Sequence, residues 1–389
     1  MHFPVDPSRR LLYVVNVSWF FLSHRLPLAV EARRRGYEVH LATHVSSTGD
    51  RATIEAAGIV LHELEVRRSD QSVSGNVGLF IVLWHLYRNL QPALVHHVTL
   101  KPVLLGGIAA RLARVPAVVA AVPGLGFSFV ARGGWAAIRR WLVLRGLRLA
   151  LRPLRGRTIF QNSDDMHLLV ESGCVRRDDA RLIPGAGVDV ARFQSLPEAP
   201  GRVRVLLAAR MLREKGIECF VAAANLLRKR GVDAEFLLAG QPDPENPGSL
   251  SPDQLRAWGA TGIINWLGKV DDMAGLMRDV HIVCLPSYYG EGVPKVLIEA
   301  AAAGRAIVTT DTPGCRDIVR ANLNGLLVPP RQPHALAEAL GQLIGDPGRR
   351  VLFGTAGRAL VESHFSLERV VTDTMAVYAE LLPAGTPTS

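Results

Sequence analysis

The chain has 389 residues, too many for one ordinary hydrophobic core, so its length favours two domains of roughly 150 to 200 residues each. Apolar residues make up 48% and charged residues 21%, a balance typical of globular proteins that excludes a mainly disordered chain. The four cysteines stand singly without a C-x-x-C pair, which excludes a disulfide framework and a thiolate zinc cluster and indicates a reducing compartment.

The net charge of +10 is concentrated in the first half of the chain. Residues 1–190 hold 24 Lys and Arg against 14 Asp and Glu, whereas residues 191–389 hold 21 of each kind. Between Asp70 and Asp164 there is no acidic residue, but there are twelve basic ones. A basic face confined to one region indicates an anionic partner such as a phosphate, a nucleic acid or a lipid head group.

The first half predicts alternating parallel strands and helices. Apolar runs predict buried strands at 11–15, 38–42, 94–98, 117–121 and 158–161. Helical patterns lie between them at 25–35, closed by Gly36, and at 102–114. The opening MHFPVDPSRR does not resemble a signal peptide, and the uncharged run 115–131 is interrupted by prolines and glycines, so we expect no transmembrane helix.

The same alternation restarts after 194–202, a segment with two prolines and a glycine that we interpret as a linker. Strands are predicted at 202–209, 234–239, 264–267, 281–286 and 306–310, and helices at 217–231, 273–278, 293–303, 333–344, 349–364 and 366–382. Two such series predict an α/β protein with two doubly wound parallel-sheet, Rossmann-like domains at 1–193 and 202–365. We expect 366–389 to form a helix that packs back toward the first domain, followed by a tail. Because ligands bind beyond the carboxyl ends of parallel strands, we expect the site in a cleft between the domains.

The strongest local pattern is YGEGVPKVLIEAAAAG at 289–304, which follows a predicted strand and opens a helix. Gly292 lets the backbone approach a ligand closely, and the amides at this helix start suit an anion. Glu291 lies before the helix and Glu299 lies further in, about 80° around the axis and about 12 Å along it. We interpret the two carboxylates as binding different hydroxyl groups of one long polar ligand. Alternatively, Glu291 only complements the helix dipole and Glu299 is solvated.

A second pattern is AARMLREKG at 208–216, in which Arg210 ends a strand and Lys215 begins the next helix. A guanidinium fork and an ammonium at the carboxyl end of a strand suit a diphosphate. A basic pair in a strand-to-helix loop is also common without such a role.

Together these two patterns closely resemble the retaining glycosyltransferases of family four (group 1 type), which have the two-domain GT-B fold. Their Glu-x7-Glu motif is matched by Glu291 and Glu299. The resemblance continues in FQNSDD (160–165), IPGAGVDVARF (183–193), TDTPGCRDIV (310–319) and NGLLVPP (324–330). At the amino end, NVSWFFLSHRLPLA, HHVTLKPV and VPGLGFSF resemble the branch that extends lipid-linked oligosaccharides in O-antigen, capsule or glycan assembly.

The resemblance implies that the second domain binds a nucleotide sugar, such as a UDP-N-acetylhexosamine. Arg210 and Lys215 would then hold the diphosphate and stabilise the charge that develops on it, while Glu299 takes the ribose hydroxyls and Glu291 contacts the transferred sugar. The remaining donor-side residues implied are Gly292, Val293, Pro294 and Lys295. No divalent metal or other cofactor is implied, and retention is expected from same-face attack assisted by the leaving phosphate.

The acceptor side departs from the family pattern at two places. Residues 122–126 lack the histidine that many members carry there, and Trp19-Phe20-Phe21 replaces their frequent glycine-rich loop. The remaining candidates for acceptor binding are His24, Arg25, His97 and Lys101. Alternatively, the histidines are packed or surface residues, and Lys101 has no contact with the acceptor.

The stretch 132–157 holds eight arginines, two tryptophans and no acidic residue. Its basic and apolar residues interleave at helical spacing, which is typical of a helix lying in a membrane interface. The predicted membrane contacts are Trp135, Arg139, Arg140, Trp141, Arg145 and Arg148. We therefore expect peripheral attachment to the inner, cytoplasmic face of the cell membrane, where a polyprenyl-diphosphate-linked acceptor would lie. The alternative is a core helix with a solvated basic face; a nucleic-acid partner is not favoured, because no recognised nucleic-acid module is present.

The leading hypothesis is thus a transferase that moves a sugar from a UDP-sugar to a polyprenyl-diphosphate-linked saccharide. Two alternatives remain open. Sugar-nucleotide 2-epimerases share the two-domain architecture, and a non-catalytic subunit could bind a nucleotide sugar for a partner chain.

Overall fold

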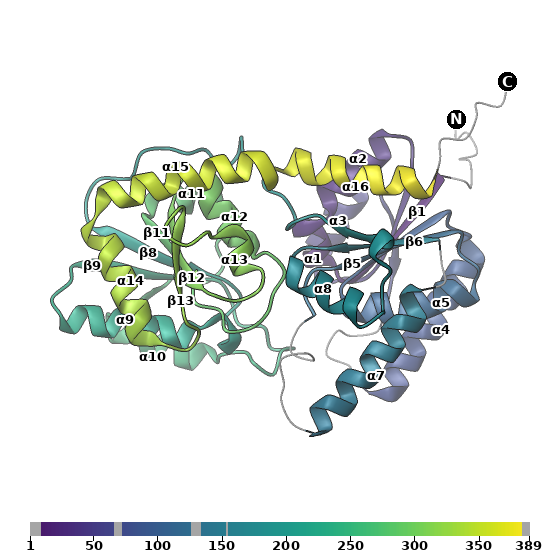
Figure 1. The fold of residues 1–389 in the computed structure, drawn as a ribbon, viewed down its shortest axis with the longest axis horizontal. Coiled ribbons are helices and arrows are strands. Elements are labelled where there is room, and N and C mark those ends of the chain that lie inside the picture. Colours follow the sequence, from purple (N-terminus) through teal and green to yellow (C-terminus); the bar gives the residue numbers. More distant parts are fainter. Residues whose placement is uncertain (1–8, 66–71, 126–133, 153–154, 383–389) are drawn as a thin grey trace. The chain divides into compact units, whose positions relative to one another are not determined.

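The computed structural model describes residues 9–65, 72–125, 134–152 and 155–382. Contacts divide the chain into two compact units, Met1–Ile183 together with Val370–Ser389, and Pro184–Arg369. Each unit is built on a parallel sheet with helices on both faces, as the alternating pattern predicted (Figure 1).

The first unit has a seven-stranded sheet in the order β3-β2-β1-β4-β5-β6-β7. Its strands are β1 (Arg10–Val17), β2 (Glu38–His44), β3 (Val60–Glu63), β4 (Leu94–Val98), β5 (Ala117–Val122), β6 (Gly156–Phe160) and β7 (Ala180–Leu182). The five central strands match the predicted apolar runs. The edge strands β3 and β7 were not predicted, because they are short and their side chains are only partly covered, so they contain no continuous apolar run.

Helices cover both faces of this sheet. One face packs against α1 (Ser18–His24), α2 (Leu26–Arg34), α3 (Thr48–Ala56) and α16 (Leu367–Leu381). The other packs against α4 (Val73–Leu90), the π-helix η2 (Pro102–Gly106), α5 (Gly107–Leu112), α7 (Gly134–Leu151) and α8 (Ser163–Glu171). A short 3₁₀ turn, η3 (Arg177–Asp179), precedes β7. The helix predicted at 102–114 therefore begins as a π-helix and ends at Leu112.

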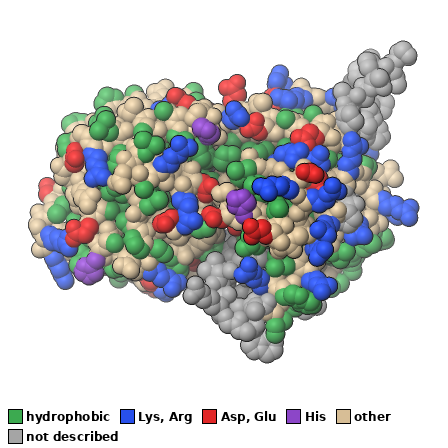
Figure 2. Space-filling view, in the orientation of Figure 1, with side chains coloured by type: hydrophobic (Ala, Val, Ile, Leu, Met, Phe, Trp, Pro, Cys, Tyr) green, Lys and Arg blue, Asp and Glu red, His purple; other side chains and the backbone are tan. Residues whose placement is uncertain are grey.

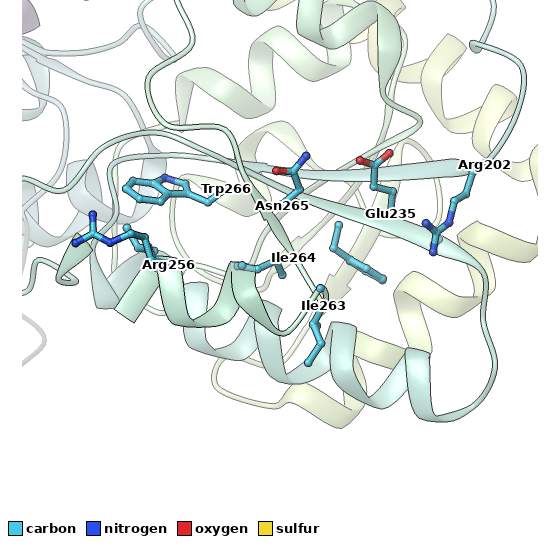
Figure 3. A pocket seen from close by; sticks show the side chains of 12 residues that line it. Arg202, Glu235, Arg256, Ile263, Ile264, Asn265 and Trp266 are labelled. Carbon is cyan, nitrogen blue, oxygen red and sulfur yellow. The ribbon is translucent and has the colours of Figure 1, made fainter. Parts of the chain in front are cut away.

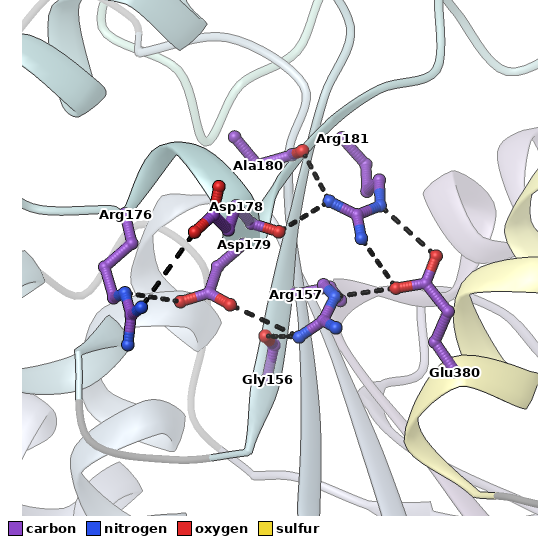
Figure 4. A network of polar contacts seen from close by, with 8 residues as sticks. All are labelled: Gly156, Arg157, Arg176, Asp178, Asp179, Ala180, Arg181 and Glu380. Atoms are coloured by element: carbon purple, nitrogen blue, oxygen red, sulfur yellow. Dashed lines mark hydrogen bonds and ion pairs between the residues drawn. The ribbon is translucent and has the colours of Figure 1, made fainter.

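Two polar clusters attach α16 to the first unit. The Tyr378 hydroxyl lies 2.9 Å from the Tyr13 hydroxyl on β1 and 2.5 Å from His96 Nδ1 on β4. Glu380 accepts from Arg157 Nε at 2.8 Å and from Arg181 Nη2 at 2.7 Å (Figure 4). These contacts join the last helix to strands β1, β4, β6 and β7.

The second unit has a six-stranded sheet in the order β10-β9-β8-β11-β12-β13. Its strands are β8 (Val203–Ala208), β9 (Ala234–Ala239), β10 (Asn265–Trp266), β11 (Ile282–Leu285), β12 (Ala306–Thr310) and β13 (Gly325–Val328). One face packs against α9 (Ile217–Lys229), α10 (Pro252–Ala260) and α14 (Pro333–Gly345). The other packs against α11 (Met273–Asp279), α12 (Lys295–Ala302) and α13 (Cys315–Ile318), and α15 (Pro347–His364) contributes to both.

The segment 184–202 lies with the second unit, so the boundary between units comes before the segment interpreted as the linker. Phe193 is 5% exposed and belongs to that unit's core. Further along, Glu198 accepts from Arg350 Nη2 at 2.7 Å, and Arg305 Nη2 donates to the Leu196 carbonyl at 2.9 Å. The Pro-containing composition of 194–202 predicts an irregular segment, but these contacts attach it to the second unit.

Candidate active site

The second sheet has one position where the connections of two neighbouring strands lead away in opposite directions. In the order β10-β9-β8-β11-β12-β13, β8 and β11 are neighbours although β9 and β10 separate them in the chain. Ligands of open parallel sheets bind at such a switch point, beyond the carboxyl ends of the strands. The loop after β8 carries Arg210 and leads to Lys215, and the loop after β11 carries Glu291.

Gly216 lets the loops after β8 and β11 approach each other. Its φ is 76°, and a Cβ at this position would lie 2.0 Å from the carbonyl oxygen of Pro286. The same residue separates the 3₁₀ turn η4 (Arg213–Lys215) from α9. The sequence predicted that Lys215 begins the α-helix. It lies in the preceding 3₁₀ turn instead, because the left-handed Gly216 separates this turn from α9.

Lys215 and Glu291 form an ion pair between these two loops, with Nζ donating to Oε2. Their side chains are 16% and 15% exposed. Ser287 Oγ lies 2.6 Å from Glu291 Oε1 and 3.0 Å from the carbonyl oxygen of Glu214, so its hydroxyl can donate to either loop. The switch point thus holds a cation and a carboxylate in fixed, partly dehydrated positions.

Arg210 has its own carboxylate partner. Its Nη1 donates to Asp243 Oδ2 at 2.6 Å, and the Asp243 amide donates to Ser249 Oγ at 2.9 Å. The Arg210 side chain is 37% exposed, while that of Asp243 is 15% exposed. Sequence reasoning missed Asp243 and Ser287, because an isolated acid or serine in a loop shows no spacing that links it to a distant cation.

Glu299 lies inside α12 and is 9% exposed. Its Oε1 is 3.5 Å from Lys295 Nζ, one turn earlier. Burial raises the pKa of Glu299, while Lys295 and Arg192 act in the opposite direction. The alternative that Glu299 is a solvated residue is wrong. A carboxylate can accept several hydrogen bonds. Besides its contact with Lys295, Glu299 can therefore also bind hydroxyl groups.

The turn before α12 packs closely against Gly314. Pro294 is the N-cap residue and the helix begins at Lys295, two residues later than predicted. A Cβ on Gly314, whose φ is 82°, would lie 2.2 Å from the Gly292 carbonyl oxygen. Next to it, burial and the Glu291 carboxylate raise the pKa of Cys315 to about 11, so this thiol is a packing residue at neutral pH.

The second unit therefore places the predicted donor residues on the two connections that follow β8 and β11. Arg210 and Lys215 belong to the first connection, and Glu291, Gly292–Lys295 and Glu299 belong to the second. Two cations suit a diphosphate, and two separately placed carboxylates suit hydroxyl groups. Because each cation is paired with an internal carboxylate, an anionic ligand would compete with Glu291 and Asp243 for them.

Two of the predicted acceptor residues are buried in the first unit. His97 is 0% exposed, its Nε2 lies 2.9 Å from the Tyr87 hydroxyl, and burial lowers its pKa to about 3. Arg25 is 5% exposed, and burial lowers its pKa. Because both side chains are buried in the interior of the first unit, we do not expect either to contact the acceptor directly.

The other two acceptor candidates lie nearer the surface. His24 is half-buried and stacks on Phe20 with ring centroids 4.1 Å apart. Lys101 directly precedes η2. At the β1–β4 switch point of the same unit, Asn16 Nδ2 donates to Thr99 Oγ1 at 2.8 Å, and Thr99 has a φ of 76°. Asn16 and Thr99 were not predicted, since neither belongs to a charged or repeated pattern.

The basic stretch forms α7, and its described side chains point largely to solvent. Trp141 is 54% exposed, and Arg145 lies over its ring at 4.8 Å. Arg140 and Arg148 are also exposed, whereas the side chains of Trp135 and Arg139 lie outside the described residues. In the described ranges, no helix has the length and apolarity needed to span a bilayer.

A cavity of about 570 Å³ lies beside the edge strand β10 of the second sheet (Figure 3). It lies between α10 and the open side of β9, next to the short strand β10, and Arg202, Glu235 and Asn265 form part of its lining. Arg202 precedes β8, whereas Arg210 follows it, so the cavity is not part of the candidate active site.

The two halves of the chain match two glycosyltransferase families. Residues 10–146 match "Glycosyl transferase 4-like" and residues 202–346 match "Glycosyl transferases group 1". The second match contains every donor-side candidate, from Arg210 to Glu299.

Relatives of the chain are named as glycosyltransferases, and solved structures share its fold. The chain is 27% identical over 70% of its length, and over 73% of the relative, to the N,N'-diacetylbacillosaminyl-diphospho-undecaprenol alpha-1,3-N-acetylgalactosaminyltransferase of Campylobacter jejuni. It is 33% identical to the phosphatidyl-myo-inositol mannosyltransferase of Mycolicibacterium smegmatis, over 53% of each chain. The fold is similar to that of Anabaena Alr3699/HepE in complex with UDP and glucose, with a TM-score of 0.74, 16% identity, and 96% and 100% of the two chains covered.

Proposed function

We propose that this chain, whose two halves match glycosyltransferase families and whose fold is GT-B, transfers a sugar with retention from a UDP-sugar to a polyprenyl-diphosphate-linked saccharide. The observation that carries the proposal is the pairing of Lys215 with Glu291 at the switch point, with Arg210 on the same loop. An N-acetylhexosamine is the sugar we favour, because a relative is named as an N-acetylgalactosaminyltransferase.

Arg210 and Lys215 would bind the diphosphate and exchange their carboxylate partners for phosphate oxygens. Glu299 would accept from the ribose hydroxyls, and Glu291 would accept from a hydroxyl of the transferred sugar. Amides of the Gly292–Pro294 turn, except that of Pro294, which has no N–H, would face the sugar or the phosphates. The UDP complex of the similar Anabaena protein supports a uridine nucleotide.

The chemistry needs charge stabilisation more than a protein nucleophile. The acceptor oxygen forms a bond to the anomeric carbon on the face from which the diphosphate leaves, and the acceptor proton passes to the leaving phosphate oxygen. Negative charge grows on the diphosphate as the bond between the sugar and phosphate breaks. Arg210 and Lys215 stabilise that charge, which lowers the barrier without a metal ion.

The acceptor proposal rests on charge and on the curated relatives. The relatives are named for diphospho-undecaprenol and phosphatidyl-myo-inositol substrates, so their acceptors are lipid-linked. The basic residues of α7, including Arg140, Arg145 and Arg148, suit an anionic bilayer. We therefore extend the proposal to peripheral attachment on the inner face of the cell membrane.

The test is an assay of the purified chain with a labelled UDP-N-acetylhexosamine and a polyprenyl-diphosphate-linked saccharide. The proposal predicts label in the lipid phase with an α linkage retained from the donor. Altered free nucleotide sugar would indicate a 2-epimerase instead. Binding of the donor without any turnover would indicate a non-catalytic subunit.

A further inference from the structure

The solvent-facing side of α4 is apolar. Val77, Ile81 and Val82 are 51%, 45% and 46% exposed. Val77 and Ile81 lie one turn apart on the same face, and Val82 follows Ile81 about 100° further around the helix. Further along the same helix, Arg88 is exposed and lies 5.9 Å from the Trp84 ring. Three neighbouring aliphatic side chains left in water cost free energy unless something covers them.

The solvent-facing side of α7 also carries large apolar residues. Ile138, Trp141, Leu142 and Leu149 are 53%, 54%, 57% and 49% exposed. Arginines 140, 145 and 148 lie among them, and Figure 2 shows hydrophobic and basic side chains mixed over the position of this helix. Leu147 of α7 packs in the core, so this helix has a buried inner side and an outer side that is both basic and apolar.

Both helices pack on the same face of the first sheet. Leu79 and Leu83 of α4 belong to one hydrophobic cluster with Leu12 and Val14 of β1, and Leu147 of α7 belongs to a second cluster with Ala120 and Val122 of β5. On β1 and β5 the even-numbered residues thus face α4 and α7, while their odd-numbered neighbours face the side that α16 covers. The order is reversed on β4, where Val95 lies on the α4 side and Leu94 and Val98 lie on the α16 side. Between the two helices, α5 exposes Leu112 (58%) and Arg111. The outward sides of α4, α5 and α7 consequently belong to one side of the first unit (Figure 1).

Charge decides what covers this side. The sequence from Gln71 to Ser163 contains all three helices and no acidic residue. A surface that binds a second protein normally contains charges of both signs. An anionic bilayer instead suits a surface that combines arginines with exposed apolar side chains.

We propose that the outer sides of α4 and α7 form one docking surface for an anionic lipid bilayer. In this surface Val77, Ile81 and Val82 enter the head-group region together with Trp141 and Leu142, and arginines of α7 bind lipid phosphates. This deepens the proposed function, since it assigns the lipid contact to α4 as well as to the basic helix. Two separate apolar helix faces also orient the unit on the membrane, which one helix alone would not do.

The experiment measures binding to vesicles of phosphatidylcholine with 30 mol% phosphatidylglycerol, taken as about a typical anionic content, by flotation. The α4 variant is Val77→Ser/Ile81→Ser/Val82→Ser, and the α7 variant is Trp141→Ser/Leu142→Ser. The matched control is Val351→Ser/Leu352→Ser on α15, because these two residues are 57% and 69% exposed and belong to the second unit. Thermal unfolding checks that each variant is folded.

We expect the α4 and α7 variants each to weaken vesicle binding at least about tenfold, and the control to leave it unchanged. Turnover of a water-soluble, short-chain acceptor should be the same in all four proteins, so loss of docking is distinguishable from loss of transferase activity. Unchanged binding by the α4 variant would overturn the assignment of α4. Equal binding to pure phosphatidylcholine, or a wild-type dimer that only the α4 variant dissociates, would overturn the anionic bilayer as the occupant.

Discussion

Lys215 and Glu291 lie 76 positions apart in the chain and yet form an ion pair, because β8 and β11 are adjacent in the second sheet. Each side chain neutralises the other in a site that is mostly shielded from water. Such a pair holds both groups in place and can be opened by a ligand that offers a stronger anion to the lysine.

Replacing Glu291 with Gln should reduce transfer about 10² to 10³-fold while the chain stays folded, because the amide keeps the contact with Ser287 but loses the charge that orients Lys215 and meets the sugar. Steady-state rates with donor and acceptor measure this effect. The control is Glu338→Gln, which removes an exposed partner of Arg230 in the same unit. Wild-type turnover in Glu291→Gln would contradict the role assigned to this carboxylate.

Asp243 should act as a positioning residue for Arg210. Asp243→Asn keeps a hydrogen-bond acceptor near Nη1 but removes the charge, so we expect kcat to fall by about tenfold with a smaller change in donor KM. Arg210→Ala should lose about a hundredfold in kcat/KM, since the diphosphate loses a fixed cation. If Asp243→Asn changed only protein stability and left kcat untouched, Asp243 would be a structural residue.

Glu299 predicts a specific dependence of stability on pH. Burial raises its pKa above the ordinary 4.5, so the unfolded chain releases this proton at lower pH than the folded chain does. The free energy of unfolding should therefore fall as pH rises from 4.5 through the raised pKa. Glu299→Gln should lack this decrease. Its free energy of unfolding, compared with that of the wild type, should therefore be higher at pH 7 than at pH 4.

The same variant should bind donor more weakly, because an ionised carboxylate accepts from ribose hydroxyls better than an amide does. We expect donor KM to rise at least about tenfold. Urea unfolding across pH 4 to 7 and donor titrations together check the prediction. A variant with wild-type affinity for the donor would remove Glu299 from the site.

The Glu198–Arg350 pair should stabilise the second unit strongly. Arg350 is 5% exposed and donates to Glu198 and to the carbonyls of Leu343 and Ile344. Glu198→Ala would leave a buried guanidinium without its counter-charge, so we expect a loss of about 3 kcal/mol in the free energy of unfolding. Glu338→Ala, which breaks an exposed pair, should cost less than about 1 kcal/mol. Similar losses in both variants would contradict this difference.

The sequence by itself predicts most of the architecture and the donor-side residues. Continuous apolar runs such as 94–98 and 117–121 predict buried parallel strands, because both faces of such strands are covered. The short edge strands β3 and β7 could not be predicted in this way, since their side chains are only partly covered. Arg210, Lys215, Glu291 and Glu299 could be identified because their spacing relative to predicted strands and helices forms recognisable patterns.

Tertiary structure alone decides which of these residues meet and which side chains are accessible. The partners Lys215 with Glu291 and Arg210 with Asp243 come from different loops, and their contact depends on strand order, which local patterns do not encode. His97 and Arg25 resemble accessible candidates in the sequence, yet packing buries them, while Val77 and Ile81 resemble core residues and remain exposed. Hydrophobic periodicity reports which residues share a helix face, but only the packing of that helix on its sheet determines whether the face meets protein or solvent.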